Sequence, residues 1–515
     1  MRTIRTTCPV LALLFVVAGC GTAPAASDAG GAPCEGSASC HDEAPPESVC
    51  LERLAADELV DGCGVFVTNE FGGGDDANPG TTKDKPVRTL QRAVEVARTG
   101  RGRVFVCADG FFGPLVLPSG VDLLGGFHCF QWKRHVGTVS QLQTTHDRAI
   151  ALTVVPATAE DTGAADGVSR IVDMGITSSE PIGVLVQSNT EVEMLRGWLR
   201  AAAGWGGYHG EDLPEPSDAA NGADGMYGGD ACSAETVAGG AAVVNPCESG
   251  MPSVGGKGGD GLPGGAEDGR DGEPTPTPNP SNHGGRGLGD LADVGCTDGN
   301  YGIYGARGTV GAPGRGIGRI SEAGWEADWA GDGGWGTPGQ GGGGGGGRRG
   351  GLGVCGAASK GGAGGGSGGA GGCGGRGGKG AGNGYPSIGI VALHARVTVR
   401  DTEIKASRGG DGGDGGEPQG GGRGGRGAPG GVLEDRSAYS CNGGPGGYGG
   451  EGGYGGPGRG GDAIGVDYLD EDRLTVEGVA FTLGPPGVGG ISWDQEGKMI
   501  SGEDGVAVEM RRFAE

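Results

Sequence analysis

The sequence predicts an all-β protein in which short parallel strands wind into a β-solenoid, and three observations lead to this prediction. One apolar pattern occurs in three segments, residues 181–207, 387–416 and 463–490. The pattern alternates as β-strands do, and a glycine-rich stretch follows it in each copy. A repeated unit of this kind buries its apolar face only against its neighbours. The copies are therefore expected to lie directly over one another as layers.

The three copies align position by position. Each opens with an Ile-Gly-Val or Ile-Gly-Ile triplet, continues with an alternating apolar pair, and has a further apolar residue five positions after that pair. The matching positions are Ile182, Gly183, Val184, Val192, Met194 and Leu199; Ile388, Gly389, Ile390, Val397, Val399 and Ile404; and Ile464, Gly465, Val466, Leu474, Val476 and Phe481. A weaker copy spans residues 149–179, where Ile171 and Ile176 have the same spacing of five. Stacking predicts that Ile182, Ile388 and Ile464 lie directly above one another in successive layers.

Glycine dominates the composition, with 127 residues of 515, against a usual share of about 7%. The excess lies between residues 204 and 461. Collagen is excluded because glycine does not occupy every third position there. The formal net charge of −25 argues against nucleic acid or an anionic lipid surface as a partner.

Residues 1–20 have the features of an export signal. Arg2 and Arg5 precede an apolar run over residues 10–18 that is too short to remain as a membrane span. The run ends in Val17-Ala18-Gly19-Cys20, which resembles a bacterial lipobox. The resemblance implies that the Cys20 thiol takes a diacylglycerol, that the mature chain begins there, and that its lipid holds it on a membrane. Gly21 replaces the aspartate of inner-membrane retention, which favours the outer membrane or cell surface; an ordinary signal peptide is the alternative.

Fourteen cysteines in an exported chain predict disulfides. Cys8 leaves with the signal and Cys20 is lipidated, so the candidates are Cys34, Cys40, Cys50, Cys63, Cys107, Cys129, Cys232, Cys247, Cys296, Cys355, Cys373 and Cys441. Five of them lie in the first glycine-rich stretch and one, Cys441, in the second, so neither stretch can pair its cysteines internally. We predict that Cys441 pairs with one of those five. Zinc is the rival hypothesis, but no CxxC or HxxxH spacing supports it, and no metal or cofactor is predicted.

The N-terminal part divides into a tether over residues 21–60, with a small cysteine-stapled knot near its end, and strands and a helix from residue 61. Pro86 ends a turn-rich loop, Thr89 can cap a helix, and Leu90, Ala93, Val94 and Ala97 fall on one helical face. A helix here would cover the open end of the stack, which is otherwise an aggregation-prone edge.

This segment resembles the N-terminal segment of bacterial right-handed parallel β-helix proteins of the pectate-lyase-like group. The residues that carry the resemblance are Asn78, Pro79, Gly80, Thr81, Lys83, Pro86, Thr89, Leu90 and Ala93. It implies a right-handed parallel β-helix with an N-terminal capping helix. Strands at residues 104–107, 115–117 and 121–124 would make the first turns, and Gly125-Gly126-Phe127 with Trp132 is a typical ending in such proteins. Cys107 and Cys129 are expected to bridge neighbouring strands.

Two long glycine-rich insertions, residues 204–386 and 409–462, leave the repeat just after Leu199 and Ile404, and residues 484–490 form a miniature third copy. Residues 61–203 form the first part of the β-helix, residues 387–408 a further layer, and residues 463–515 a layer and a C-terminal cap. Because layers stack about 4.8 Å apart, equivalent corners lie one above another, and the insertions are expected to emerge side by side. The insertions could be disordered or could form a bundle of polyproline II strands, and we favour a loosely ordered, disulfide-tied bundle.

In composition the insertions are similar to the PGRS surface proteins of mycobacteria.

Candidate functional residues are few. Trp325, Trp329 and Trp335 could stack on sugar rings, although anchoring of a loop is the favoured interpretation. Residues 255–262 fit a calcium-binding nonapeptide once, for which chance is the better account in a glycine-rich chain. The charged candidates Asp173, Glu193, Arg400, Asp401, Asp467 and Asp470 share no aligned position, and His394 has no catalytic partner nearby in the sequence.

The sequence therefore indicates a non-enzymatic, lipid-anchored cell-surface protein. Its β-helix would present a glycine-rich, disulfide-linked projection for adhesion, binding or envelope structure. The expected partners are a membrane, through the lipid, and a carbohydrate or surface-protein ligand. The alternatives are a carbohydrate-active β-helix enzyme, a polysaccharide lyase or hydrolase, and a spacer without a ligand.

Overall fold

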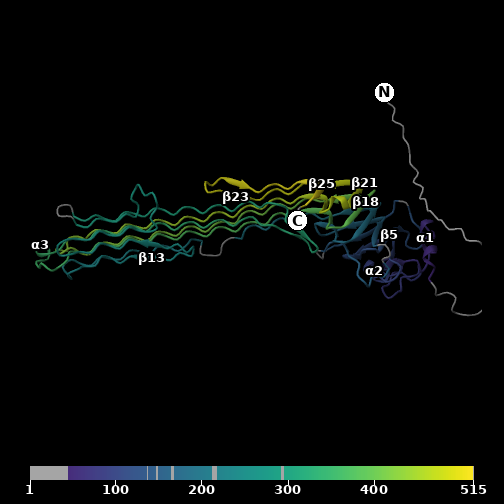
Figure 1. Cartoon of the computed structure of the whole chain (residues 1–515), viewed down its shortest axis with the longest axis horizontal. Helices are drawn as coiled ribbons and strands as arrows, with labels where there is room; N and C mark the ends of the chain where they lie inside the picture. The colour runs from purple at the N-terminus through teal and green to yellow at the C-terminus, as the bar shows by residue number, and fades with distance from the viewer. Residues whose placement is uncertain are drawn as a thin grey trace, which may run out of the picture. The chain divides into compact units, whose positions relative to one another are not determined.

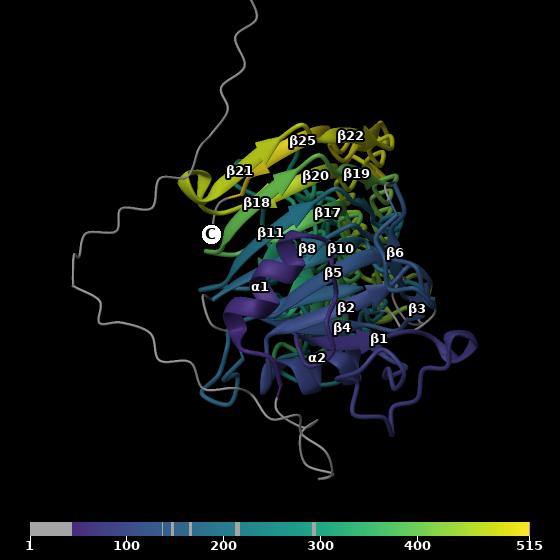
Figure 2. The ribbon, with the colours of Figure 1, turned by 90° about the vertical axis from the view of Figure 1, so that its right-hand side faces the viewer.

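A computed structural model describes residues 44–513 apart from residues 136, 146–148, 164–166, 212–216 and 291–294. The compact unit Pro45–Glu515 is mostly β, with parallel sheets and few helices (Figures 1 and 2). The predicted signal peptide, with Cys20, and most of the predicted tether fall outside the described residues.

Three parallel sheets organise the first and last parts of this unit. In stacking order, sheet 1 contains β1 (Val65–Val67), β2 (Arg103–Cys107), β5 (Asp122–Phe127), β8 (Val168–Val172), β11 (Glu191–Leu195), β18 (Arg396–Arg400) and β21 (Leu474–Glu477). Sheet 2 contains β3 (Gly110–Phe112), β6 (Ser140–Gln143), β9 (Met174–Thr177), β12 (Trp198–Arg200), β19 (Glu403–Ala406) and β22 (Ala480–Leu483). Sheet 3 contains β4 (Leu115–Pro118), β7 (Leu152–Val155), β10 (Ile182–Val186), β17 (Ser387–Ala392), β20 (Ala463–Tyr468) and β25 (Ala507–Arg512). From β2 onward the chain visits sheets 1, 2 and 3 in turn, as the stacked arrows of Figure 2 show.

The predicted register is confirmed. Ile388 of β17 is the partner of Ile182 in β10 and of Ile464 in β20. The neighbouring glycines face the apolar residues of sheet 2: a Cβ on Gly389 would lie 2.5 Å from Ile404 Cγ2, and one on Gly465 would lie 2.4 Å from Phe481 Cδ1. The repeated Ile-Gly opening thus leaves room for the later apolar residue of the same copy.

The main core lies between the three sheets. Val192 and Met194 of β11, and Val397 and Val399 of β18, are buried, while the residues between them are only partly covered. This alternation is the period of two that the sequence shows. Ile182, Ile388 and Ile464 belong to a second, smaller cluster, against which Ile320 and Trp325 pack. These two residues belong to the hairpin of β15 (Arg319–Ser321) and β16 (Gly324–Glu326), which lies in the first insertion.

One tight corner recurs between sheets 1 and 2. Asp173, Arg196, Asp401 and Gly478 have φ values of 53°, 53°, 47° and 63°. The corners also bond to one another, since Asp173 N–H donates to Leu195 O and Arg196 N–H donates to Arg400 O. Left-handed backbone is strained in residues other than glycine, so the layers above and below stabilise a conformation that the sequence alone does not favour.

The predicted helix is α2 (Leu90–Arg98), and its predicted cap is confirmed because Thr89 accepts a hydrogen bond from Arg92 N–H. Its buried residues are Leu90, Ala93, Val94 and Ala97, the predicted face. The helix packs against β1, β2 and β4, the first strands of the stack. Asp76 fixes the preceding loop, since its carboxylate accepts hydrogen bonds from the N–H groups of Arg88 and Thr89.

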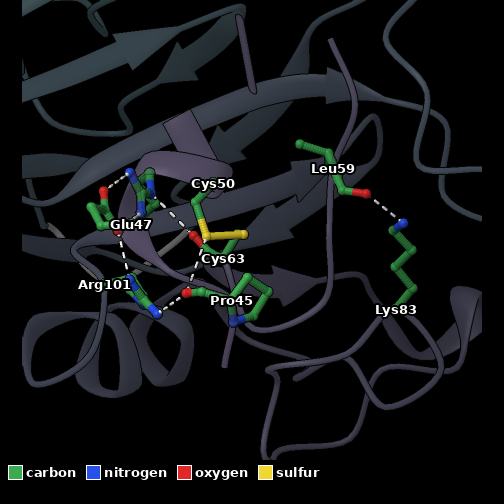
Figure 3. The surroundings of a disulfide bond; sticks show 8 residues. Pro45, Glu47, Cys50, Leu59, Cys63, Lys83 and Arg101 are labelled. Carbon is green, nitrogen blue, oxygen red and sulfur yellow. Dashed lines mark hydrogen bonds and ion pairs between the residues drawn. A yellow bond between two sulfur atoms is a disulfide. The ribbon is translucent and has the colours of Figure 1, made fainter. Parts of the chain in front are cut away.

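Near the end of the predicted tether, where a cysteine-stapled knot is expected, residues Glu47–Ala55 form a helix, α1, that the sequence does not predict. Glu47 binds the guanidinium groups of Arg101 and Arg103, and the disulfide Cys50–Cys63 joins α1 to the residues before β1 (Figure 3). The composition around α1 is typical of a linker, so the sequence contains no signal for this helix. The ion pairs and the disulfide to distant residues hold it in place.

The predicted C-terminal cap is also more regular than its sparse apolar pattern suggests. β23 (Ile491–Trp493) and β24 (Met499–Ser501) form a hairpin, and β25 then pairs in parallel with β20. As the edge strand of sheet 3, β25 needs few apolar residues. The remaining elements are η1 (Glu70–Gly72), η2 (Glu471–Arg473), α3 (Leu352–Cys355), and β13 (Val243–Asn245) with β14 (Ser253–Gly255).

Candidate binding surface on the glycine-rich bundle

Both insertions leave the stack at the same corner, the passage from sheet 2 to sheet 3. They follow β12 and β19, and the miniature copy follows β22. Gly204 N–H donates to Arg408 O at 2.8 Å, and Gly409 N–H donates to Pro485 O at 3.1 Å. Segments about two hundred and about eighty residues apart therefore run side by side from their first residues.

The insertions form one hydrogen-bonded bundle of extended runs (Figure 1). The bonds recur every third residue: Gly302, Gly305, Gly308 and Gly311 donate to the carbonyls of Pro445, Tyr448, Glu451 and Tyr454. A period of three is that of the polyproline II helix, which has no internal hydrogen bonds and must bond to neighbouring chains. The bundle is thus more ordered than the loose arrangement we predicted.

Glycine is required where these runs touch. Residues 361–384 form a central run that is almost wholly buried. A Cβ on Gly368 would lie 1.9 Å from Gly342 O, and one on Gly375 would lie 1.9 Å from Gln419 O. Neighbouring backbones occupy the space of a side chain, so the runs can approach only where side chains are missing. The glycine content is therefore a packing requirement of the bundle.

Three disulfides hold the bundle together. Cys232–Cys355 and Cys247–Cys373 lie within the first insertion, and Cys296–Cys441 joins the first insertion to the second. The structure thus pairs Cys441 with one of the five cysteines that we predicted. Cys107 pairs with Cys129, and Cys50 with Cys63, while Cys34 and Cys40 lie outside the described residues. Asp109 lies beside Cys107 and Cys129, but the disulfide leaves that group no thiolate for a metal.

A hollow of about 570 Å³, which we call hollow 1, lies on the bundle. Trp335 forms part of its wall and is 44% exposed. The guanidinium of Arg376 binds Glu248 across the hollow, with Nη2 and Oε2 2.6 Å apart. Other polar residues that line it are Asp218, Asn221, Gln419 and Arg423. The disulfide partner Cys373 fixes Cys247, and with it the wall residues on either side, Pro246 and Glu248.

A second hollow of about 510 Å³, hollow 2, has an aromatic wall. The rings of Tyr208 and Trp329 are nearly parallel, 7° apart in orientation with centroids 6.1 Å apart, and both side chains are largely exposed. Lys379 Nζ binds Asp332 Oδ2 at 2.7 Å, and Gly380 N–H donates to Asp332 Oδ1. The hydrogen bond from Lys379 is the largest cause that holds the pKa of Asp332 below its ordinary value.

The tryptophan prediction is only partly right. Trp325 does anchor a loop: its ring packs on Tyr385 with centroids 4.2 Å apart, and its Nε1–H donates to Ile317 O. Trp329 and Trp335 instead present most or much of their rings to solvent. Trp329 is part of the lining of hollow 2, and Trp335 is part of the lining of hollow 1.

The charged candidates are mostly held in ion pairs. Asp173 binds Arg134 and Arg196, Glu193 lies 3.7 Å from Arg170, and Arg400 binds Glu477. His394, which has no catalytic partner nearby in the sequence, is brought beside Asp470 by the fold: Asp470 Oδ2 lies 3.0 Å from His394 Nδ1, because each residue follows one of the neighbouring strands β17 and β20. Asp401 occupies the same left-handed corner as Asp173, two layers away, so the expectation that the charged candidates share no aligned position is wrong for these two. Asp467 is fully buried.

The calcium-type nonapeptide has a structural use. Asp260, its acidic residue, accepts hydrogen bonds from Gly239 N–H and from Lys257 Nζ, at 2.8 and 2.7 Å. The carboxylate therefore ties two glycine-rich runs together. This contact explains the aspartate without a metal ion.

Comparisons with family models, with curated proteins and with solved structures find no match to this chain. Among the described residues, none of the helices has the length and apolar character needed to cross a membrane.

Proposed function

We propose that this chain is a lipid-anchored protein of the cell surface that binds a ligand through its glycine-rich bundle. Under this proposal the stacked sheets form a right-handed parallel β-helix of the pectate-lyase-like kind, α2 covers its first layer, and the bundle is a rigid projection. The observation that carries the proposal is the ordered bundle itself, with hydrogen bonds at every third residue, three disulfides and exposed aromatic side chains.

The rigidity of the bundle favours binding over a spacer role. A passive spacer needs length but not order, and a flexible glycine-rich linker supplies length. Here the chain instead loses the large conformational entropy of its glycines and fixes several aromatic rings at its surface. A preorganised surface reduces the entropy lost on binding.

Binding without catalysis is also the function that the charged residues support. The carboxylates Asp173, Glu193 and Asp470 each lie beside a cationic or imidazole side chain. A glycoside hydrolase needs two carboxyl groups that face one another across the substrate. Incubation with polygalacturonate, followed at the absorbance of unsaturated products, and a reducing-sugar assay with neutral glycans are expected to show no turnover.

The binding proposal is tested with the whole chain and a variant in which short turns replace residues 204–386 and 409–462. This excision removes both partners of each bundle disulfide, and circular dichroism shows whether the β-sheets survive. On a printed glycan array and on mucin-coated surfaces, the whole chain is expected to bind and the variant to lose binding. Equal binding by the whole chain and the variant would place recognition on the sheets and contradict the proposal. A result in which neither protein binds would also contradict it.

The lipid anchor is tested separately. Cys20→Ser is expected to leave the signal uncleaved by the lipoprotein peptidase and to abolish incorporation of labelled palmitate. Unchanged labelling of this variant would contradict the anchor without affecting the proposed role of the bundle.

A further inference from the structure

Hollows 1 and 2 lie in one line on the bundle. Trp329, Asp332 and Trp335 follow one another at intervals of three residues, so they share one face of an extended run with three residues per turn. At about 3.1 Å per residue, the two tryptophans stand ~19 Å apart. Asp332, between them, lines hollow 2.

The neighbouring run has the same period. Gly333 N–H donates to Gly378 O and Gly336 N–H to Gly375 O, so residues 330–339 and 372–381 lie side by side in opposite directions. Arg376 lines hollow 1 and Lys379 lines hollow 2, three residues apart. The pair Lys379–Asp332 joins the two runs. The hollows therefore lie one after the other along the same two runs, and we call them together the tryptophan groove.

The chemistry of the tryptophan groove fits sugar rings. An exposed indole offers a flat apolar face for the C–H groups of a pyranose ring. Around Trp335, planar polar groups of Asn221, Glu248 and Arg376 can donate to and accept from pairs of hydroxyl groups. Around Trp329, the Glu211 carboxylate and the His209 imidazole also offer hydrogen-bond donors and acceptors. Aromatic platforms with several amide, carboxylate and guanidinium groups suit a ligand that carries many hydroxyls.

The charge of the groove points to a neutral ligand. Its carboxylates are Asp218, Glu248, Glu211 and Asp332, and its cations are Arg376, Arg423 and Lys379. The two signs nearly balance, and two of the cations are already paired with Glu248 and Asp332. A phosphate or sulfate chain would meet no excess of positive charge here.

We propose that the tryptophan groove binds a linear neutral polysaccharide. One sugar ring would stack on Trp335, and another ring, several sugar units further along the polysaccharide, would stack on Trp329 beside Tyr208. A monosaccharide cannot reach both platforms, whereas an oligosaccharide can. This inference rests on the proposed function and names the ligand class and the site on the bundle.

The test is calorimetric titration of the whole chain with cello-, chito-, manno- and malto-oligosaccharides from two to eight residues long. At least one series is expected to bind, with affinity that rises with length until the ligand spans both platforms. Trp329→Ala and Trp335→Ala are each expected to weaken binding of the longest ligand by tenfold or more. Trp329→Phe and Trp335→Phe, which keep a flat ring, are expected to lose less than the alanine variants.

The matched control is Tyr304→Ala, because Tyr304 is an exposed aromatic residue of the same bundle that lines neither hollow. It is expected to leave affinity unchanged, and thermal unfolding shows whether each variant is folded. No binding in any series, affinity independent of length, or an equal loss in Tyr304→Ala would overturn the inference.

The two proposals fail differently. If the chain binds mucin-coated surfaces through the bundle but the Trp329→Ala, Trp335→Ala double variant binds equally well, the groove is wrong and the proposed function stands. Binding that survives enzymatic removal of the glycans from mucin identifies a protein ligand and also overturns the groove. If the chain without insertions binds as the whole chain does, the proposed function itself fails.

Discussion

Asp467 of β20 and Arg511 of β25 are register partners on adjacent parallel strands, with Asp467 Oδ2 and Arg511 Nη2 3.6 Å apart. Both oxygens of Asp467 are buried without a hydrogen bond, while Arg511 Nη1 binds Asp462 instead. Burial raises the pKa of Asp467 to about 7, with Arg511 opposing the shift and Asp462 adding to it. The last layer of the stack thus contains a carboxyl group that titrates near neutral pH.

The titration of Asp467 makes stability fall as pH rises through neutrality. Its ordinary pKa is 3.8, so between about pH 4 and pH 7 the folded chain binds a proton that the unfolded chain releases. The free energy of unfolding is therefore expected to fall over this window, by up to about 1.4 kcal/mol per pH unit from this group. Asp467→Asn, which stays neutral, is expected to gain stability relative to the native chain as pH rises from 5 to 8, in urea unfolding followed by circular dichroism.

The native chain and Asp467→Asn share every other titrating group, so the comparison between them isolates Asp467. Asp472→Asn, the same exchange at an exposed residue of the same segment, serves as the control. A constant difference in stability between the native chain and Asp467→Asn from pH 5 to pH 8 would contradict the raised pKa.

The contact of Glu47 with two arginines predicts the opposite dependence on pH for α1. Hydrogen bonds from Arg103, and then from Arg101, hold the pKa of Glu47 below its ordinary value of 4.5. The contribution of Glu47 is present above about pH 4.5 and is lost as pH falls through the lowered pKa. Because the Glu47 side chain is 49% exposed, solvent screening limits the loss in Glu47→Gln to about 1 kcal/mol.

Hydrogen exchange measured by mass spectrometry checks this prediction. Glu47→Gln is expected to accelerate exchange in Glu47–Ala55 and in Val65–Val67, while Glu52→Gln on the same helix is expected to leave it unchanged. Equal exchange in both variants would show that the disulfide Cys50–Cys63 alone holds α1.

The sequence was sufficient to predict the stacking because each copy repeats its own packing. Each copy contains an isoleucine, a glycine after it, and a later apolar residue that packs against that glycine, as Ile404 packs against Gly389. The register of the strands and the corner at which the insertions leave therefore follow from the alignment of the copies. The tryptophan groove has no such repeat. Arg376 meets Glu248 and Lys379 meets Asp332 only because separate glycine-rich runs lie in a particular register, which glycine itself does not encode. The pair His394–Asp470, by contrast, follows from the same alignment, because each residue lies six positions after the aligned isoleucine of β17 or β20.

The disulfide Cys296–Cys441 is expected to stabilise the bundle, since it closes a loop between residues 145 apart. Restriction of the unfolded chain by a loop of this size corresponds to about 2–5 kcal/mol. Cys296→Ser with Cys441→Ser is expected to lower the thermal midpoint of the bundle, with little effect on the sheets. Peptide mapping without reduction checks the pairing itself, and a peptide that links Cys441 to Cys247 or Cys355 would contradict it.

Glycine at the contacts between runs is expected to be irreplaceable even by alanine. A Cβ on Gly368 would lie 1.9 Å from Gly342 O and 2.4 Å from Gly342 C, both backbone atoms that no change of side-chain rotamer can move. Gly368→Ala must therefore separate two runs and break hydrogen bonds such as that from Gly368 N–H to Gly256 O, at a cost of about 1–3 kcal/mol or more. In an ordinary extended chain the same exchange would stabilise the protein slightly, because alanine restricts the unfolded state.

The two effects have opposite signs, so a pair of variants separates them. Gly264 lies in the same insertion, but nothing lies within 4 Å of the position its Cβ would occupy. Gly264→Ala is expected to be neutral or slightly stabilising in chemical unfolding, and Gly368→Ala destabilising. If both variants had the same stability, backbone contact at Gly368 would not limit its side chain, and the glycine content would need an explanation other than close packing of extended runs.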